Sequence, residues 1–196
     1  MIRPRGSLAA NIAVALRALL LHGTGCKVLQ VGGRVSEGSI DPALFRAVLG
    51  TYPTGVCAIT ASGADGAPVG MVIGSFTSVS LDPPLVGFLP DKKSSSWPQI
   101  EAAGHFCVNV LASDQMVVCR QLAAKGTDKF AGLDFALSDH GQPVIAGSIA
   151  RIDCTIHGVI DAGDHWFVLG KVLAMETTRE DDPMLFYRGR YGGFAG

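Results

Sequence analysis

Residues 66–98, GAPVGMVIGSFTSVSLDPPLVGFLPDKKSSSWP, decide the fold of this chain. Their first half reads as one strand in which small residues alternate with apolar ones, and the strand ends at Asp82-Pro83-Pro84. A second strand follows at residues 85–89, and it leads into Lys92, Lys93 and three serines before Trp97. The small residues of the first strand are Gly70, Gly74, Ser75, Ser78 and Ser80.

Small residues in a strand and polar residues after it point to a ligand. Glycine inside a strand loses packing and costs entropy, so a row of small residues indicates that something flat lies close to the backbone. Three serines before a helix, with two lysines beside them, suit a phosphate. The segment therefore predicts a flat phosphorylated cofactor, and a flavin mononucleotide moiety is the leading candidate.

Length and composition narrow the class of protein. A chain of 196 residues with a formal charge of −1 and a pI near 6.5 predicts one main domain and gives no reason to expect a nucleic-acid partner. Cysteine is odd in number and has no metal-ligand or redox spacing, which favours reduced, buried thiols in a cytosolic protein. These cysteines are Cys26, Cys57, Cys107, Cys119 and Cys154.

The first forty residues differ from the rest of the chain. Residues 7–21 place leucine and isoleucine at helical spacing, and Ser7 is a suitable N-cap. Arg17 interrupts the apolar stretch and no small-residue cleavage site follows, so we expect neither an export signal nor a membrane span. We predict an N-terminal extension at residues 1–40, with a short amphipathic helix and a flexible linker at residues 22–39.

The main domain is expected at residues 41–196. Asp41-Pro42 predicts the start of a helix with an apolar face that ends at Gly50, and Ser96 with Gln99 has the pattern of a capping box. Strands are predicted at 56–62, 105–111, 149–160 and 165–175, and a helix at 114–125. Strands and helices do not alternate regularly, so the pattern predicts a mainly β protein: an antiparallel barrel with peripheral helices.

Six blocks in order carry a family resemblance. They are TGVCAIT (54–60), GMVIGSFTSVSLDPPLV (70–86), FCVNVL (106–111), KF (129–130), GDHWFVLGKV (163–172) and PMLFYRGRY (183–191). The chain resembles the flavin reductase-like family, and within it the short reductase components of two-component flavin-dependent monooxygenases. The resemblance implies an antiparallel Greek-key split β-barrel of the FMN-binding type, which pairs as a homodimer.

The resemblance also implies a flavin site. Reduced flavin gathers negative charge near N1 and the C2 carbonyl, so backbone N–H groups facing that edge would favour reduction without a dedicated cation. Two hydroxyls common in relatives are missing, because Val72 and Gly74 stand where many relatives have Thr and Ser. The residues implied are Pro68, Val69, Gly70, Met71, Val72, Gly74 and Ser75 at the ring, Leu89, Pro90 and Asp91 at the ribityl chain, and Ser95 and Ser96 at the phosphate.

The same resemblance places a nicotinamide cofactor beside His165, which follows the Gly163-Asp164 turn. Hydride transfer to the flavin needs close stacking and no obligatory base, so His165 is expected to position NAD(P)H and to donate a hydrogen bond. Arg188, Gly189, Arg190 and Tyr191 match the family's segment over the bound dinucleotide. The other histidines show no ligand spacing, and no metal site is expected.

These expectations combine into one function. We expect a cytoplasmic homodimer that reduces free FMN or FAD with NADH or NADPH and releases it by diffusion to an oxygenase component that hydroxylates a small, aromatic compound. No nucleic acid or membrane partner is expected. The alternatives are a general flavin reductase, a flavin- or heme-binding split-barrel protein without turnover, and a pyridoxamine phosphate oxidase, for which no basic substrate pocket is visible.

Overall fold

The structure is a computed structural model that describes residues 40–126 and 128–194. The main unit is Ile40–Gly196, and the predicted helix and linker of the extension lie outside the described residues. The helices are α2 (Pro42–Leu49), α3 (Trp97–Ala103) and α4 (Met116–Ala123). The strands are β1 (Thr54–Gly55), β2 (Cys57–Ser62), β3 (Pro68–Ile73), β4 (Thr77–Leu81), β5 (Pro84–Phe88), β6 (His105–Val110), β7 (Phe135–Leu137), β8 (Pro143–Ile145), β9 (Ala150–Ala162), β10 (His165–Thr177), β11 (Leu185–Tyr187) and β12 (Arg190–Gly192).

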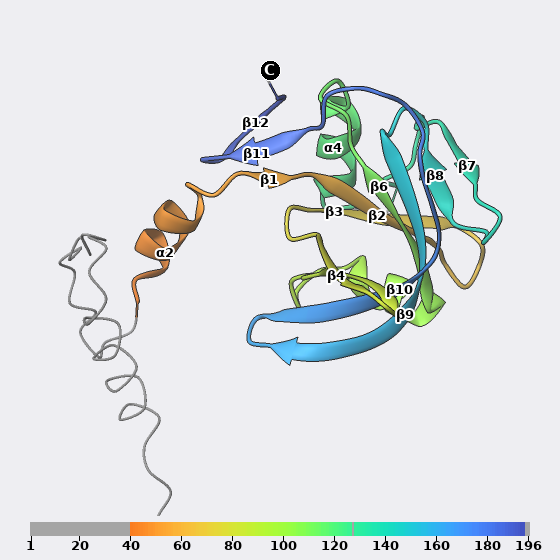
Figure 1. The fold of residues 1–196 in the computed structure, drawn as a ribbon, viewed down its shortest axis with the longest axis horizontal. Helices are drawn as coiled ribbons and strands as arrows, with labels where there is room; N and C mark the ends of the chain where they lie inside the picture. Colours follow the sequence, from red (N-terminus) through yellow and green to blue (C-terminus); the bar gives the residue numbers. More distant parts are fainter. Residues whose placement is uncertain (1–39, 127, 195–196) are drawn as a thin grey trace, which may run out of the picture. The chain divides into compact units, whose positions relative to one another are not determined.

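Seven strands form an antiparallel sheet in the order β3-β2-β6-β9-β10-β5-β4. β3 and β4 are its two edges, although only residues 74–76 join them. Strands about 4.8 Å apart would separate the edges of a flat sheet by about 29 Å, whereas this connection spans at most about 14 Å between the flanking Cα atoms. The sheet therefore curls until its edges approach (Figure 1), and the predicted antiparallel barrel with peripheral helices is confirmed.

The strand predicted from the small residues is wrong in one respect. It is two strands, β3 and β4, which belong to opposite edges of the sheet. Its predicted end at Asp82-Pro83-Pro84 is correct, because Leu81 pairs with Pro84 and the chain returns as β5. A run of alternating residues cannot reveal a three-residue change of direction, since the alternation continues on both sides of it.

The long β9–β10 hairpin is confirmed. Both strands have 13 residues, and they pair from His165 opposite Ala162 to Thr177 opposite Ala150 with two register shifts. β2 does not alternate because it is buried on both faces. Cys57, Ile59 and Ala61 belong to the core inside the barrel, whereas Val56 and Ala58 belong to a second core that includes Leu122 of α4 and Phe130. Such burial explains the continuous apolar run.

Aromatic side chains fill the barrel core. Phe88 makes edge-on contacts with Trp97 and Phe106, at ring-centroid distances of 5.9 and 5.3 Å. Within the described residues the cysteines are free, and all of them are buried, as predicted for these positions; they are Cys57, Cys107, Cys119 and Cys154. Burial raises the pKa of the Cys57, Cys107 and Cys154 thiols to about 12.

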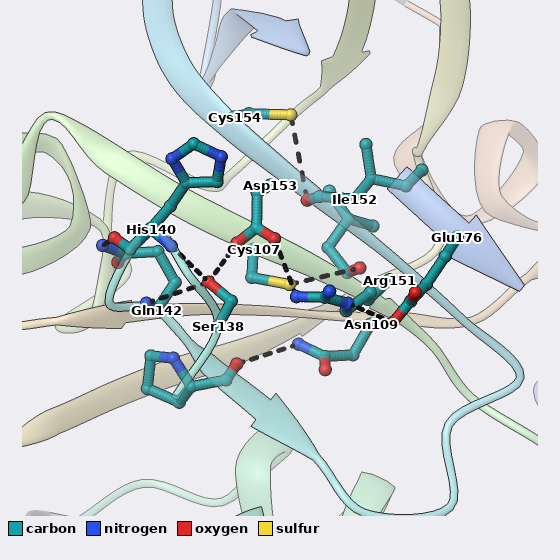
Figure 2. A network of polar contacts seen from close by, with 12 residues as sticks. Cys107, Asn109, Ser138, His140, Gln142, Arg151, Ile152, Asp153, Cys154 and Glu176 are labelled. Carbon is teal, nitrogen blue, oxygen red and sulfur yellow. Dashed lines mark hydrogen bonds and ion pairs between the residues drawn. The ribbon is translucent and has the colours of Figure 1, made fainter. Parts of the chain in front are cut away.

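A buried polar network holds the β7–β8 hairpin against the barrel (Figure 2). The Asn109 side-chain oxygen accepts from the Ile145 N–H at 2.8 Å, and its nitrogen donates to Thr60 Oγ1 at 2.9 Å. Asp153, which is fully buried, accepts from Ser138 Oγ at 2.7 Å and pairs with Arg151 at 3.3 Å. These contacts replace the hydrogen bonds to water that each polar group loses on burial.

Helix α2 begins as predicted, because Asp41 accepts hydrogen bonds from the Ala43 and Leu44 N–H groups. Its apolar face, however, contributes no buried residue. The exposed side chains include Leu44, Phe45, Val48 and Leu49, each more than half exposed. None of the helices in the described part of the chain has the length and apolar character needed to cross a membrane.

The capping box predicted at Ser96 is wrong. Ser96 has helical backbone angles and its side chain caps no N–H of α3. Ser94 does so instead, accepting from the Trp97 N–H at 3.2 Å, while the Gln99 amide donates to the Ser95 carbonyl. With three serines in succession, the spacing could not determine which hydroxyl faces the helix.

Candidate functional site

A groove of about 1040 Å³ lies where the curled sheet closes. One wall is the end of β3 and the connection after it, and a second is the segment after β5. The β9–β10 turn and α2 complete it. The lining residues are Ile40, Pro42, Phe45, Arg46, Met71, Val72, Ile73, Gly74, Ser75, Leu89, Pro90, Asp91, Ala162, Asp164 and His165.

Backbone hydrogen bonds fasten the β9–β10 turn to the segment after β5. The Trp166 N–H donates to the Pro90 carbonyl and the Lys92 N–H donates to the Asp164 carbonyl, both at 3.0 Å. Asp91 and His165 consequently face each other as an isolated antiparallel bridge. Each wall of the groove therefore holds the other in place.

His165 has a defined tautomer. Its Nδ1 lies 2.7 Å from the Asp164 carboxylate, and this hydrogen bond lowers the pKa of Asp164. A carboxylate only accepts, so Nδ1 carries the proton. When the ring is neutral, Nε2 is then an acceptor, whereas the sequence analysis expected a donor.

Ser75 joins the end of β3 to the segment after β5. Its hydroxyl accepts from the Leu89 N–H at 2.9 Å and donates to the Leu89 carbonyl at 3.3 Å. The N–H groups of Gly74 and Ser75 have no acceptor among the described residues. The serine side chain is thus used within the protein, and the adjoining backbone remains available to a ligand.

A second groove, of about 810 Å³, lies at the β11–β12 hairpin. The hairpin turns at Arg188, whose φ is 47°, and Gly189, whose φ is 75°. The Arg188 N–H donates to the Gly50 carbonyl at 3.0 Å, and its guanidinium lies 5.2 Å from the centre of the Tyr187 ring. The lining residues are Thr51, Pro53, Leu185, Tyr187, Arg188, Arg190, Tyr191, Gly192 and Gly193.

Comparison with known families decides the identity of this domain. The model described as the flavin reductase like domain matches residues 49–195. The chain belongs to this family. The matched range begins at the last residue of α2. It contains the whole second groove and every part of the first groove except α2 and Ile40.

Individual proteins are similar to this chain over most of their length. A flavin reductase from Pseudomonas putida is 57% identical over 166 residues, which cover 85% of this chain and 98% of that protein. The crystal structure of nitrilotriacetate monooxygenase component B from Mycobacterium thermoresistibile is 50% identical, with a TM-score of 0.75 over 78% of this chain and 86% of the other. The NADH:FAD oxidoreductase SgcE6 from Streptomyces globisporus, solved with NAD and FAD fragments, is 37% identical, with a TM-score of 0.75 over 81% of this chain and 97% of the other.

The first groove of this flavin reductase like domain suits a flavin. Its volume matches that of pockets for cofactor-sized ligands, and the available N–H groups of Gly74 and Ser75 supply the kind of donors that reduced flavin requires. The groove brings together part of the predicted flavin set with His165. The residues brought together are Met71, Val72, Gly74, Ser75, Leu89, Pro90 and Asp91.

The other predicted flavin residues lie elsewhere. Pro68 and Val69 are at the far end of β3, and Val69 is part of the barrel core. A Cβ on Gly70 would lie 3.1 Å from the Phe130 ring, so internal packing accounts for this glycine. Ser95 is exposed and lines neither groove.

Ser96 and the nearby lysines have partners within the protein. Ser96 is buried, and Lys129 Nζ donates to its Oγ at 3.0 Å. Burial lowers the pKa of this lysine. Lys92 pairs with Asp161 at 2.5 Å and lies 4.4 Å from the centre of the Trp166 ring. The predicted phosphate-binding group is therefore mostly engaged in internal contacts.

The nicotinamide residues predicted from sequence are divided between the grooves. His165 is in the first, whereas Arg188, Arg190 and Tyr191 line the second and Gly189 forms its turn. Sequence analysis missed Phe45 and Arg46, which form the outer wall of the first groove. The sequence placed them only on a helix with an apolar face. It gave no sign that this helix lies beside the groove.

Proposed function

We propose that this protein reduces free FMN or FAD with NADH or NADPH. The observation that carries the proposal is the first groove, where His165 lies with the Gly74–Ser75 backbone in one open cavity. Membership of the flavin reductase like family and the three similar proteins support the same activity.

The residues of the groove perform positioning rather than proton chemistry. Bound flavin supplies the redox chemistry, because its ring accepts a hydride from a reduced nicotinamide. The Gly74 and Ser75 N–H groups would hold a bound flavin and stabilise the negative charge that it gains on reduction. His165, oriented by Asp164, accepts a hydrogen bond from the nicotinamide carboxamide and fixes the reduced ring against the flavin.

Turnover tests this proposal directly. Purified protein should oxidise NADH or NADPH at a rate that saturates in added FMN or FAD, with no oxygenase present. Riboflavin serves as the flavin without a phosphate. A rate equal to the flavin-only background with every combination of nucleotide and flavin contradicts the proposed reductase.

The reduced flavin, in our proposal, diffuses to an oxygenase component that hydroxylates a small aromatic compound. The open groove supports release, and the monooxygenase component B similar to this chain supports the partner. Coupling can be measured by separating the reductase from a candidate oxygenase with a dialysis membrane. Hydroxylation across the membrane indicates diffusion, and product formed only on mixing contradicts it.

We further propose a cytoplasmic homodimer. The exposed apolar face of α2, Leu44, Phe45, Val48 and Leu49, is better covered by a second copy than by water. Buried thiols without disulfides suit a reducing compartment. Light scattering should give twice the chain mass for the full chain and for a chain lacking residues 1–39. A monomeric full-length protein contradicts the dimer, and a dimer lost only on truncation shows that the extension is required.

A further inference from the structure

One lysine contacts both strands of the β9–β10 hairpin. Lys92 Nζ pairs with the Asp161 carboxylate of β9 at 2.5 Å, and it lies 4.4 Å from the centre of the Trp166 ring of β10. Asp161 and Trp166 are opposite each other in the register of the hairpin. Lys92 therefore contacts a cross-strand pair, although it is not among the residues that line either of the two grooves.

These contacts lie at the base of the turn that leads to His165. Asp161 Oδ1 accepts from the Gly163 N–H at 3.1 Å, while its other oxygen accepts from Lys92 Nζ. Trp166 directly follows His165 and packs against the barrel core. The Lys92 side chain thus connects the carboxylate that shapes the turn to the ring that anchors it.

The backbone of Lys92 binds the same turn. Its N–H donates to the Asp164 carbonyl at 3.0 Å, next to the bond from the Trp166 N–H to the Pro90 carbonyl. The turn itself is exposed, and exposed turns open locally at a low cost in free energy. Backbone and side chain of one residue therefore fasten the His165 turn to the segment after β5.

The side-chain contacts of Lys92 are suited to positioning rather than to stabilising the fold. The hydrogen bond from Lys92 lowers the pKa of Asp161, so this carboxylate is ionised at neutral pH. An exposed ion pair and a cation–π contact are each weak, and their loss would leave the barrel folded. A small displacement of His165 is enough to matter, because hydride transfer depends on how closely the two rings are aligned.

We propose that Lys92 is a positioning residue of the reductase: it holds the His165 turn against the segment after β5 and so fixes where the reduced nicotinamide lies on the flavin. This inference rests on the proposed function for the role of His165. The sequence presents Lys92 and Lys93 as a pair, but Lys93 is exposed and forms no ion pair with the described residues. The role therefore belongs to Lys92 alone.

Steady-state kinetics with two hydride donors tests this role. Lys92→Gln should lower kcat/KM about fivefold for NADH, and equally for 1-benzyl-1,4-dihydronicotinamide, which has the carboxamide but no phosphate. Lys92→Arg should recover most of the loss. Lys93→Gln, which removes the same charge from the next residue, should stay within twofold of the wild type. The dissociation constant for flavin should stay within twofold in every variant.

A double-mutant cycle shows whether Lys92 acts through His165. In a His165→Ala background, Lys92→Gln should change kcat/KM by less than twofold, because the group that it positions is gone. Amide hydrogen exchange tests the same contact without turnover. Lys92→Gln should speed exchange of the Trp166 amide about fivefold, and leave that of the Ile59 amide, in the middle of the seven-stranded sheet, unchanged.

Four results would overturn the assignment. One is an unchanged kcat/KM in Lys92→Gln, and another is a fivefold loss that persists in the His165→Ala background. The third is a loss with NADH but not with the benzyl compound, which would mean that Lys92 attracts the phosphates. The fourth is an unchanged exchange rate of the Trp166 amide. A wild-type protein that oxidises neither donor refutes the proposed function instead, and amide exchange still tests Lys92.

Discussion

The buried network around Asn109 and the groove around His165 differ in where their polar groups find partners. In the network, Asn109, Thr60 and Asp153 all bond to other protein groups. In the groove, the Gly74 and Ser75 N–H groups have no acceptor among the described residues, and Arg46 forms an ion pair with none of their carboxylates. The first arrangement stabilises the fold, whereas the second preserves binding capacity.

The largest expected effect breaks the network. Asn109→Ala removes the acceptor of the Ile145 N–H and the donor to Thr60. We expect the free energy of unfolding to fall by about 3 kcal/mol, because the Ile145 N–H loses its acceptor and the Thr60 hydroxyl, which still donates to the Pro143 carbonyl, loses its donor. Denaturant titration measures it, and flavin reduction per folded molecule should not change. A loss below about 1 kcal/mol would show that the network contributes little.

His165→Ala tests the groove without disturbing the network. We expect kcat/KM for NADH to fall between about tenfold and a hundredfold, because a positioning hydrogen bond is lost. The dissociation constant for flavin should stay within twofold. His157→Ala, an exposed histidine of β9 outside the groove, is the matched control. An unchanged kcat/KM in the His165 variant removes this residue from the site.

Alkaline pH should lower the stability of the barrel core. The thiols of Cys57, Cys107 and Cys154 have pKa values near 12 instead of 9. The unfolded chain therefore loses these protons first, so the thiols' contribution to stability is constant well below pH 9 and falls as pH rises through 9 toward 12. Each thiol contributes a slope of about 1.4 kcal/mol per pH unit once its unfolded form is ionised.

Unfolding titrations at pH 8 and pH 10 measure the change. Cys57→Ala, compared with the wild type at both values, should show a smaller loss of stability by one thiol's share. Equal losses in the two proteins would mean that Cys57 ionises equally easily in the folded and unfolded states.

Ser75→Ala should have the smallest effect on stability and on flavin affinity. Ser75 lines the groove, but its hydroxyl bonds to Leu89 within the protein. The substitution removes both hydrogen bonds to Leu89, which lowers stability by about 1 kcal/mol. We expect flavin affinity to fall only a few-fold, since the backbone N–H groups remain. Ser78→Ala on the exposed strand β4 is the control. A hundredfold loss of flavin affinity would show that the hydroxyl itself binds flavin.

The elements best predicted from sequence are those with local causes. Asp41 caps α2, and alternation in β9 and β10 follows from a sheet with two different faces. Gly70 was misleading, because its small size fits the Phe130 ring, which is sixty residues away in sequence. Contacts of that kind depend on the fold and leave no pattern near the glycine.

Much of the site was predicted where one segment supplies it, whereas His165, from a distant segment, was predicted only through the family resemblance. Met71, Val72, Gly74 and Ser75 were predicted together with residues 89–91, because only the turn at Phe76, β4 and β5 separate the two sets in sequence. Ile73, which also lines the groove, was missed. Arg46 was missed as well, since only the closed barrel brings α2 beside His165. The separation of His165 from the arginine hairpin also follows from strand order, which sequence spacing does not reveal.

The short connection between β3 and β4 affects how the barrel can be cut and rejoined. Residues 74–76 are the covalent link between the two edge strands, so a circular permutant opened there keeps every strand pairing but loses that closure. A flavin bound to Gly74 and to Leu89 would then act as a cross-link across the open seam. In such a permutant, flavin should raise the melting temperature more than in the native chain, because ligand binding would also restore the closure.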